Sequence, residues 1–255
     1  MKMLRITIQL LRMNWSTLLM YRINFFNSLI TSFVWSVFHI VTMLLYTHSI
    51  HSIGSWGVPD LLLLSVMYSS VIGIFHMFLS RNFERLSRLV RLGELDAVLA
   101  RPIDTQFAVS LWLVNYTAIV RIIIGIGFSI WIITSYHLPV SLMNIAGMIV
   151  MAFAGCGILY SIWMLFSVSI IWYPRLTNIT DLLYTVNTLG RYPQQTYVGS
   201  GDLLFYFALP FTAAINTPVR VLRGTISVPE ILMMICISIG CVLVSRFIFY
   251  RSLRS

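Results

Sequence analysis

The chain has 255 residues, of which 58% are hydrophobic and only 10% are charged, and its mean hydropathy is +0.88. Soluble globular domains carry about 25% charged residues, so this composition excludes a soluble globular protein and indicates an integral membrane protein. The net charge of +9 requires no nucleic acid partner, because it follows from the positions of Lys and Arg between the apolar segments.

The N-terminal segment, residues 1–22, has the pattern of an amphipathic helix. Its apolar face would contain Leu4, Ile8, Leu11 and Trp15, and its polar face would contain Lys2, Arg5, Gln9 and Arg12. No small-residue cleavage site follows an apolar region of the length that a signal peptide requires. We therefore expect a retained helix that lies in the membrane interface and leads into the first span.

Six apolar runs follow, and each is a candidate for a membrane span, since a bilayer core of about 30 Å requires about 20 helical residues. They are residues 23–46, 61–80, 107–136, 142–172, 176–189 and 231–250. The runs are continuous rather than alternating, which favours helices over a β-barrel. The fifth is the weakest, because it is short and contains several polar residues. We expect an all-α polytopic membrane protein whose six-span domain covers residues 23–255.

Basic residues are distributed unevenly between these runs. Lys and Arg concentrate before the first run, between the second and third, and at the C-terminal end, whereas the connections at 48–59 and 137–141 have none. The positive-inside rule therefore places both termini and the 81–104 loop in the cytoplasm. The 190–230 segment is expected outside, although it carries three arginines.

The 81–104 loop mixes apolar and charged residues. Phe83, Leu86 and Val90 recur at helical spacing, with arginines on another face, so the second span should continue as an amphipathic helix. Gly93 interrupts this helix, and Pro102 forces the chain out of any helix that follows.

A second short helix can run from Glu94, with Leu95, Val98 and Leu99 as its apolar face. A helix of this length is not stable alone. We therefore expect its apolar face to bind a protein partner; the alternative is that the loop lies on the lipid head groups.

Arg121 interrupts the third apolar run. A central Arg costs about 2.5 to 3.5 kcal/mol on insertion scales, so it requires a partner or a wet cavity. Asp181 in the fifth run is the acid that could pair with it, and Asn187 is a further polar residue of that run. A structural ion pair and a charge that lines a transport pathway both remain open.

Residues that usually bind metals are sparse. Cys156, Cys236 and Cys241 lie inside predicted spans without a C-x-x-C spacing, so neither a disulfide framework nor a zinc site is indicated. His48 and His51 have no third ligand nearby, which favours polar residues at a membrane boundary over a metal site.

One string matches a known enzymatic motif. Residues 199–202 read G-S-G-D and match the G-x-G-D of intramembrane aspartyl proteases, which need two carboxylates that share a proton. Asp202 lies in a predicted outer loop, and its only plausible partner, Asp181, is not preceded by the tyrosine of those enzymes. We favour a Gly-rich turn with Asp202 at a helix start. No phosphate-binding loop is present, so any use of ATP requires another chain.

The outer segment is apolar at residues 203–214, which is too short to span the bilayer. Pro210 and Pro218 flank or interrupt this stretch. A re-entrant pair of helices fits this pattern, and so does an apolar loop packed on the spans.

Two stretches carry a family resemblance. "LGELDAVLARPID", residues 92–104, and "LPFTAAINTPVRVLRG", residues 209–224, resemble corresponding regions in one branch of the ABC type 2 transporter permeases. The G-E-L-D followed by R-P carries the first likeness, and I-N-x-P carries the second. The basic N-terminal helix and the six spans with both termini inside agree with this resemblance, which covers the whole chain in layout but only these two stretches in motif.

The resemblance implies a permease of an ATP-binding-cassette transporter in the cytoplasmic (inner) membrane, most often an exporter, without enzymatic activity of its own. Two permease chains, identical or homologous, would pair through the first and fifth spans. Each would sit on a cytoplasmic ATPase that binds ATP and Mg²⁺. The alternative function is a nucleotide-independent channel or a membrane scaffold.

The resemblance also assigns roles to residues. In that family the loop between the second and third spans carries a coupling helix that contacts the ATPase. Here this contact would comprise Leu92, Glu94, Leu95, Asp96, Val98, Leu99 and Arg101, with the three residues of the apolar face as anchors and the charges at the rim. The outer segment would form re-entrant helices that cap the pathway, with gate candidates Pro210, Asn216 and Pro218. The transported substrate is not indicated.

Overall fold

The structure, a computed structural model, describes residues 2–49, 52–173, 178–197 and 202–253, without the side chains of residues 2–4 and 202–208. His51, residues 176–177 of the fifth apolar run and residues 199–201 of the G-S-G-D string lie outside this described part. The α-helices are α1 (Lys2–Met20), α2 (Arg22–Ser49), α3 (Val58–Phe78), α4 (Ser80–Leu92), α5 (Leu95–Leu99), α6 (Thr105–Ser110), α7 (Ile119–Ser135), α8 (Leu142–Trp172), α9 (Ile179–Asn187), α10 (Asp202–Leu222) and α11 (Val228–Ser252). The shorter elements are the 3-10 helices η1 (Tyr116–Ala118), η2 (Thr188–Arg191) and η3 (Gln194–Tyr197) and the antiparallel strands β1 (Ser52–Ile53) and β2 (Trp56–Gly57).

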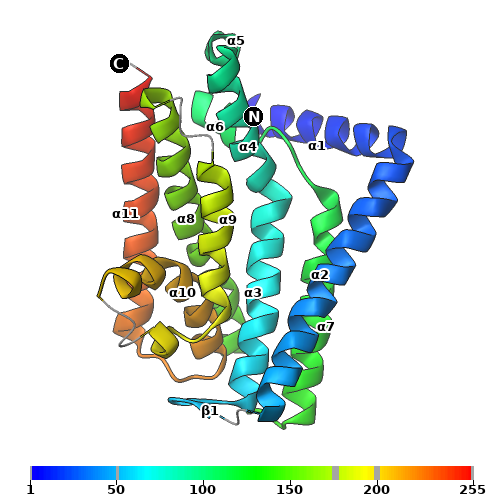
Figure 1. Cartoon of the computed structure of the whole chain (residues 1–255), viewed down its shortest axis with the longest axis vertical. Coiled ribbons are helices and arrows are strands. Elements are labelled where there is room, and N and C mark those ends of the chain that lie inside the picture. Colours follow the sequence, from blue (N-terminus) through cyan, green and yellow to red (C-terminus); the bar gives the residue numbers. More distant parts are fainter. Residues whose placement is uncertain (1, 50–51, 174–177, 198–201, 254–255) are drawn as a thin grey trace.

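The long helices run side by side between two ends of the molecule. Both chain termini lie at the same end as α5, and the β1–β2 hairpin lies at the other (Figure 1). Among the described residues, five helical stretches are long and apolar enough to cross a membrane: α2, α3, η1 with α7, α8, and α11. The expected all-α polytopic membrane fold is confirmed, whereas a count of six spans stays a prediction.

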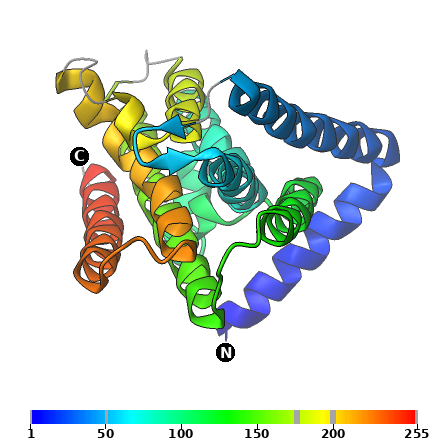
Figure 2. The ribbon, with the colours of Figure 1, turned by 90° about the horizontal axis from the view of Figure 1, so that it is seen from below.

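Helix α3 forms the centre of the bundle. It is surrounded by other helices in the view along the bundle (Figure 2), and 72% of its most apolar stretch is buried, against 17 to 33% for the other four. Leu61, Leu62, Leu63 and Leu64 are all buried, because a helix covered on every side needs no polar face. The other long helices expose Phe, Ile and Leu side chains outward, as lipid-facing helices do.

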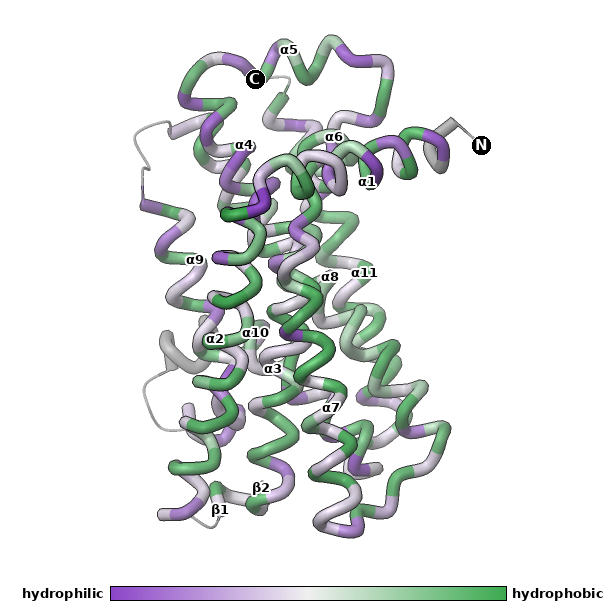
Figure 3. The backbone as a smooth tube through the Cα atoms, turned by 90° about the vertical axis from the view of Figure 1, so that its right-hand side faces the viewer, coloured by the Kyte–Doolittle hydropathy of each residue, from purple (hydrophilic) through white to green (hydrophobic). Residues whose placement is uncertain are grey.

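Hydrophilic residues gather at the ends of the bundle and apolar ones along its length (Figure 3). Helix α1 lies across one end, at a steep angle to α2 (Figure 1). Its expected apolar face includes Ile8 and Trp15, which are 44% and 49% exposed. This orientation and this uncovered apolar face are what an interfacial helix requires.

The third apolar run is not one continuous helix. Residues 107–136 divide into α6, a non-helical stretch at residues 111–115, η1 and α7. The side chain of Asn82, which is fully buried, accepts a hydrogen bond from Leu113 N–H (2.8 Å) and donates one to Leu113 C=O (2.7 Å). Asn115 N–H donates to Met77 C=O at 2.7 Å. These bonds satisfy backbone groups that a helix would have paired internally, so the break is stable.

The fifth predicted span is also shorter than expected. Helix α9 and η2 carry the chain from the end where α8 terminates toward the end that holds α10 (Figure 1). The 9 residues of α9 extend only about 14 Å at about 1.5 Å per residue, roughly half of a bilayer core. Helix α9 ends at Asn187, where the chain continues as the tighter 3-10 helix η2.

The outer segment forms one helix instead of the expected pair. Pro210 and Pro218 both lie inside α10. Pro218 has no N–H to donate to the carbonyl of Ala214, four residues earlier. The Ala214 backbone packs directly against Gly155 of α8, where a Cβ would collide with the Ala214 carbonyl oxygen and lie 3.0 Å from its carbonyl carbon. Gly155 therefore allows α8 and α10 to approach at the proline position.

Replacing Gly155 with Ala should destabilise the protein, because α8 and α10 must separate to admit the methyl group. Overpacking of this kind typically costs about 1 to 3 kcal/mol. The matched control is Gly127→Ala in α7, where a Cβ meets no atom within 4 Å and the change should be neutral or stabilising by up to about 1 kcal/mol. Thermal unfolding in detergent measures both, and equal Tm values for the two variants would contradict the close α8–α10 contact.

Candidate functional site

The candidate site is the helical tip formed by α4, α5 and α6, residues 80–110, at the end that holds both termini (Figure 1). As expected, α4 continues α3 and ends before Gly93. Gly93 has φ 68°, a left-handed conformation that favours glycine and commonly ends helices. Glu94 N–H then donates to Leu89 C=O at 2.9 Å. The chain turns sharply there and presents α5 as a separate short helix.

The residues predicted to contact an ATPase differ in exposure. Leu92 is 63% exposed, and the two acids, Glu94 and Asp96, are also exposed. Leu95 is partly buried and packs against the hydrophobic core. Val98 is only 2% exposed and belongs to that core. In this structure Val98 attaches α5 to the protein, so its side chain is not available to a partner.

Leu99 is partly buried, and Arg101 folds back onto the protein. The Arg101 guanidinium lies 4.3 Å from the ring centroid of Trp112, and that of Arg85 lies 5.4 Å from the same ring. These distances are within the range of cation–π contacts. Arg101 thus ties the end of α5 to the 111–115 stretch, and the surface free for a partner consists chiefly of Leu92, the two acids and part of Leu99.

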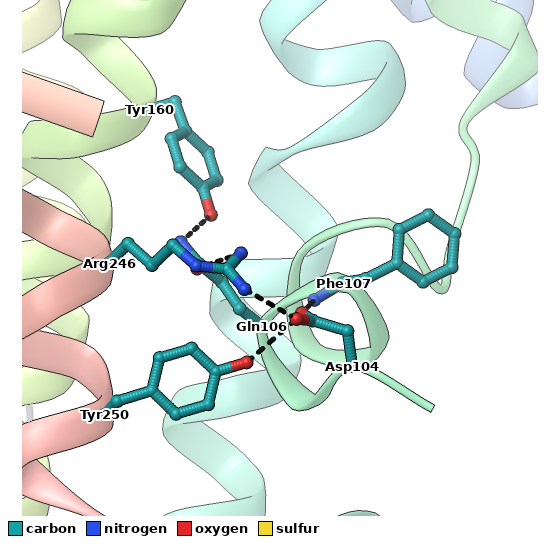
Figure 4. Close-up of polar contacts among 6 residues, drawn as sticks. All are labelled: Asp104, Gln106, Phe107, Tyr160, Arg246 and Tyr250. Carbon is teal, nitrogen blue, oxygen red and sulfur yellow. Dashed lines mark hydrogen bonds and ion pairs between the residues drawn. The ribbon is translucent and has the colours of Figure 1, made fainter. Parts of the chain in front are cut away.

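Asp104 anchors the other end of the tip, as Figure 4 shows. Its Oδ1 accepts a hydrogen bond from Phe107 N–H (2.9 Å), which caps α6. Its Oδ2 accepts from Arg246 and from the Tyr250 hydroxyl, both at 2.9 Å and both from α11. One carboxylate therefore fixes the start of α6 and joins it to the last membrane helix.

A second set of bonds joins α6 to α8. The Gln106 amide donates to the Tyr160 hydroxyl at 2.7 Å, and Ser110 lies 3.0 Å from the same oxygen. Arg246 also donates to the Gln106 side-chain oxygen at 3.3 Å. The tip is thus bonded to two spanning helices, α8 and α11, while α4 extends directly from a third. A force applied at α5 would act on these three helices together.

The sequence indicates the helix cap at Asp104 but not the bonds of Asp104 to α11. Asp104 follows Pro102 and precedes an apolar run, which is the pattern of a helix N-cap. We expected the third span to begin near residue 107 and did not predict this cap. The bonds to Arg246 and Tyr250 join positions more than 140 residues apart, and no local pattern indicates them.

Burial tends to raise the pKa of Asp104, but the hydrogen bonds from Phe107, Tyr250 and Arg246, together with the Arg246 charge, outweigh it and lower that pKa. A lowered native pKa means that the unfolded chain binds this proton more readily. The stabilisation is therefore complete above the unfolded value, about 3.9, and is lost as pH falls through the lower native pKa. At neutral pH the carboxylate contributes fully.

Inside the bundle, Arg121 and Asp181 do not pair. Among the described residues no ion pair joins them, Asp181 is exposed in the first turn of α9, and the buried Nε of Arg121 has no hydrogen-bond partner. The Arg121 side chain packs against α3 where Gly73 leaves room for it. Asn187 is buried and accepts a long hydrogen bond, 3.4 Å, from Trp163 Nε1. Asn187 thus joins α9 to α8.

Arg191, expected in the outer segment, also points into the bundle. Its guanidinium lies 5.2 Å from the ring centroid of Tyr68 on α3, and its buried Nε has no hydrogen-bond partner. The Tyr68 ring in turn meets His39 of α2 edge to face at 5.4 Å. From the sequence we expected Arg191 in a loop. Because α9 ends at Asn187 and continues as η2, Arg191 lies within the bundle, against Tyr68 of α3.

At the outer end, Asn216 is the most connected of the three gate candidates. It is 3% exposed, and its amide donates to Thr212 C=O (2.8 Å) and Tyr192 C=O (3.4 Å). Its side-chain oxygen accepts from Gln194 N–H at 3.3 Å. Asn216 therefore holds the loop after η2 against α10, while Pro218 is buried and Pro210 partly buried in the same helix.

None of these sites has the composition of a metal centre: within the described ranges, no group of three or more His, Cys, Asp and Glu could hold an ion. A comparison with protein families matches residues 33–255 to the family described as ABC-2 family transporter protein. The match contains both the helical tip and the outer segment, at the level of the family rather than of one branch. No curated protein and no solved structure matches the chain.

Replacing Asp104 with Ala should lower the stability of the protein at neutral pH. Loss of a helix N-cap alone costs about 0.5 to 2 kcal/mol, and the start of α6 also loses its bonds to α11. The control is Asp96→Ala, which removes an exposed carboxylate from α5 and should leave Tm unchanged. Thermal unfolding at pH 7 compares the two variants, and a shift no larger for Asp104→Ala than for Asp96→Ala would contradict the anchoring role.

Proposed function

This chain belongs to the ABC-2 transporter family, and we propose that it forms half of the permease of an exporter in the cytoplasmic (inner) membrane. In this proposal a second permease chain, identical or homologous, completes the pathway, and two separate cytoplasmic ATPase subunits bind ATP and Mg²⁺. The family establishes a multi-pass permease subunit of an ABC transporter, a class that acts with ATP-binding subunits. The direction of transport, the pairing and the ATPase contact are the proposal.

The helical tip is the observation that carries this proposal. It extends beyond the level of α1 (Figure 1), and it exposes apolar and acidic side chains that its own fold leaves uncovered. It is also bonded to α8 and α11 through Asp104, Gln106 and Tyr160. To transmit a movement of the ATPase to the membrane helices, the permease needs an exposed contact that is firmly bonded to those helices. The tip has both properties.

The distribution of charge supports a cytoplasmic position for the tip. Its end of the molecule holds five arginines between residues 81 and 101, in addition to those of α1 and α11. At the opposite end, Arg220 pairs with Glu230 at 2.8 Å, and Arg223 approaches Asp60 at 2.6 Å. Basic residues therefore accumulate at one end, as the positive-inside rule expects, because that rule counts Lys and Arg and not net charge.

One face of the bundle is suited to a second permease chain. In the view along the bundle, α2 and α9 lie on the same side of α3 (Figure 2). Phe33 and Phe38 of α2 and Leu182 of α9 are 50 to 53% exposed. Pairing through this face follows the arrangement that the resemblance implies for the first and fifth spans, and it would cover apolar surface on both chains.

The ATPase contact is tested by Leu92→Asp. Burying a leucine in a contact contributes about 1.5 to 3 kcal/mol, so the variant should retain its ATPase at least tenfold more weakly in pull-down and should lose ATP-driven transport. Its Tm should not change, because the side chain is exposed. Tyr173→Asp is the matched control, since Tyr173 is 66% exposed at the end of α8 and lies outside the tip.

Full ATPase retention and transport in the Leu92→Asp variant would contradict the coupling role of the tip. A chain that conducts its cargo without nucleotide would instead favour the channel alternative. Purification of the native complex with its neighbouring subunits provides the material for both measurements.

The pairing of permease chains is tested by cysteine cross-linking in membranes that contain the native complex. Leu182→Cys on α9 should form a disulfide-linked or bismaleimide-linked permease pair, because the proposed interface brings this position toward a second chain. Leu243→Cys, 61% exposed on α11, is the matched control on another face and should remain uncross-linked. A native mass spectrum with a single permease chain per complex would rule out the pairing.

A further inference from the structure

A strongly basic cavity runs along α4, from the base of the helical tip to its exposed end. It has a volume of about 520 Å³. Its lining residues are Arg81, Glu84, Arg85, Arg88, Arg91, Leu92 and Leu113. The single acid, Glu84, accepts a hydrogen bond from the Tyr184 hydroxyl. Four arginines thus line one space with one glutamate among them.

These arginines have no acidic partner within the part of the chain that the structure describes, where the ion pairs involve Arg220, Arg223 and Arg246. Arg85 is the most confined, because it lies against Trp112 and donates to Ala108 C=O at 3.4 Å. Burial, followed by the nearby charges of Arg101 and Arg88, lowers its pKa. Like charges held together in this way favour an anionic ligand that would relieve their repulsion.

A second cavity adjoins the first, since both are lined by Arg81 and Leu113. Its volume is about 300 Å³. The remaining lining residues come from α1, the start of α2 and the stretch up to η1: Asn14, Thr17, Leu18, Tyr21, Asn24, Phe25, Ser28, Val114, Asn115 and Thr117. It contains no further charged residue, and it opens where the interfacial helix turns into the first spanning helix. A charged space and an uncharged, partly apolar space thus share one wall.

The position of the two cavities along the bundle is consistent with the boundary between the bilayer core and its head groups. Helix α3 ends at Phe78, so Arg81 stands about 5 Å beyond it at about 1.5 Å per residue. The polar head-group layer on each side of a bilayer core is about 5 to 8 Å thick. Helix α1 crosses at this level, while α5 lies further out (Figure 1). A bilayer core that ends with α3 would place the Arg81 end of the basic cavity in the head-group layer, whereas its other end reaches Leu92 on the exposed tip.

We propose that these two cavities bind one anionic phospholipid of the inner leaflet, with its phosphate against Arg81, Arg85 and Arg88 and its glycerol and upper acyl chains beside α1 and α2. Guanidinium groups bind phosphate oxygens through paired hydrogen bonds, and basic pockets between membrane helices are suited to such head groups. The lipid would join α1, the 111–115 stretch and the base of the tip. Occupancy would thus stabilise the part of the chain that supports α5.

The test uses the purified permease chain alone, so its outcome does not depend on the proposed ATPase coupling. Delipidated protein is titrated with phosphatidylglycerol or with phosphatidylcholine, and binding is followed by thermal shift and by native mass spectrometry. Phosphatidylglycerol should raise Tm and remain bound, with an affinity at least tenfold above that of phosphatidylcholine. Equal effects of the two lipids would overturn the proposal.

The double variant Arg81→Gln, Arg88→Gln should bind phosphatidylglycerol at least tenfold more weakly, because two phosphate-facing charges are removed. Both side chains are exposed, so the fold should persist, and an unchanged Tm of the lipid-free variant verifies this. The matched control, Arg12→Gln with Arg251→Gln, removes two exposed arginines from the same end but outside both cavities. An equal loss of binding in the control would show general attraction to a basic surface and would overturn the site.

Two further arms identify the occupant. Glycerol 3-phosphate and inorganic phosphate should not raise Tm at concentrations where phosphatidylglycerol saturates, and saturation by either would assign the cavity to a soluble anion instead of a lipid. If the double variant keeps its phosphatidylglycerol affinity, the lipid proposal is wrong. Loss of ATPase retention by the same variant, measured separately on the native complex, would then assign the arginines to an acidic protein surface.

Discussion

The two hydrogen bonds between Asn82 and Leu113 are the constraint on which one end of this protein depends. Within the hydrocarbon core, a membrane protein must pair every backbone group that its helices do not pair, and residues 111–115 interrupt the helices between α6 and the spanning stretch of η1 and α7. Asn82, fully buried where α3 continues into α4, supplies both a donor and an acceptor to that stretch. These two hydrogen bonds fix the non-helical segment against the junction of α3 and α4.

Other contacts at this end are built on the held segment. Trp112 C=O accepts a hydrogen bond from Asn14 of α1 at 3.0 Å, and its ring lies under the guanidinium groups of Arg85 and Arg101. Tyr116 donates to Leu11 C=O at 2.9 Å, again in α1. The interfacial helix, the basic cavity and the end of α5 therefore share one support, residues 111–116.

The arginines at the two ends and in the middle of the molecule differ in their acidic partners. Those of the outer end lie beside acids, whereas those of α4 share a cavity with a single acid. Within the bundle, Arg121 and Arg191 approach α3 with unpaired Nε atoms. Most of the net charge of +9 comes instead from the two terminal segments, residues 1–22 and 246–255, which carry seven basic residues and no acid, and the interior adds Arg121 and Arg191.

The sequence by itself determined the membrane class, the all-α fold, four long spans to within a few residues, the helix break at Gly93 and the family, because hydropathy, helical periodicity and glycine conformation are local properties. It did not predict the break at residues 111–115, the continuous helix α10 or the inward position of Arg191. Nor did it predict that Val98 faces the core rather than a partner. Those features depend on contacts between positions distant in the chain: Asn82 with Leu113, the Ala214 backbone with Gly155, and Asp104 with α11. Only the packed structure decides them, since a buried polar group takes whichever partner the neighbouring helices bring within hydrogen-bonding distance.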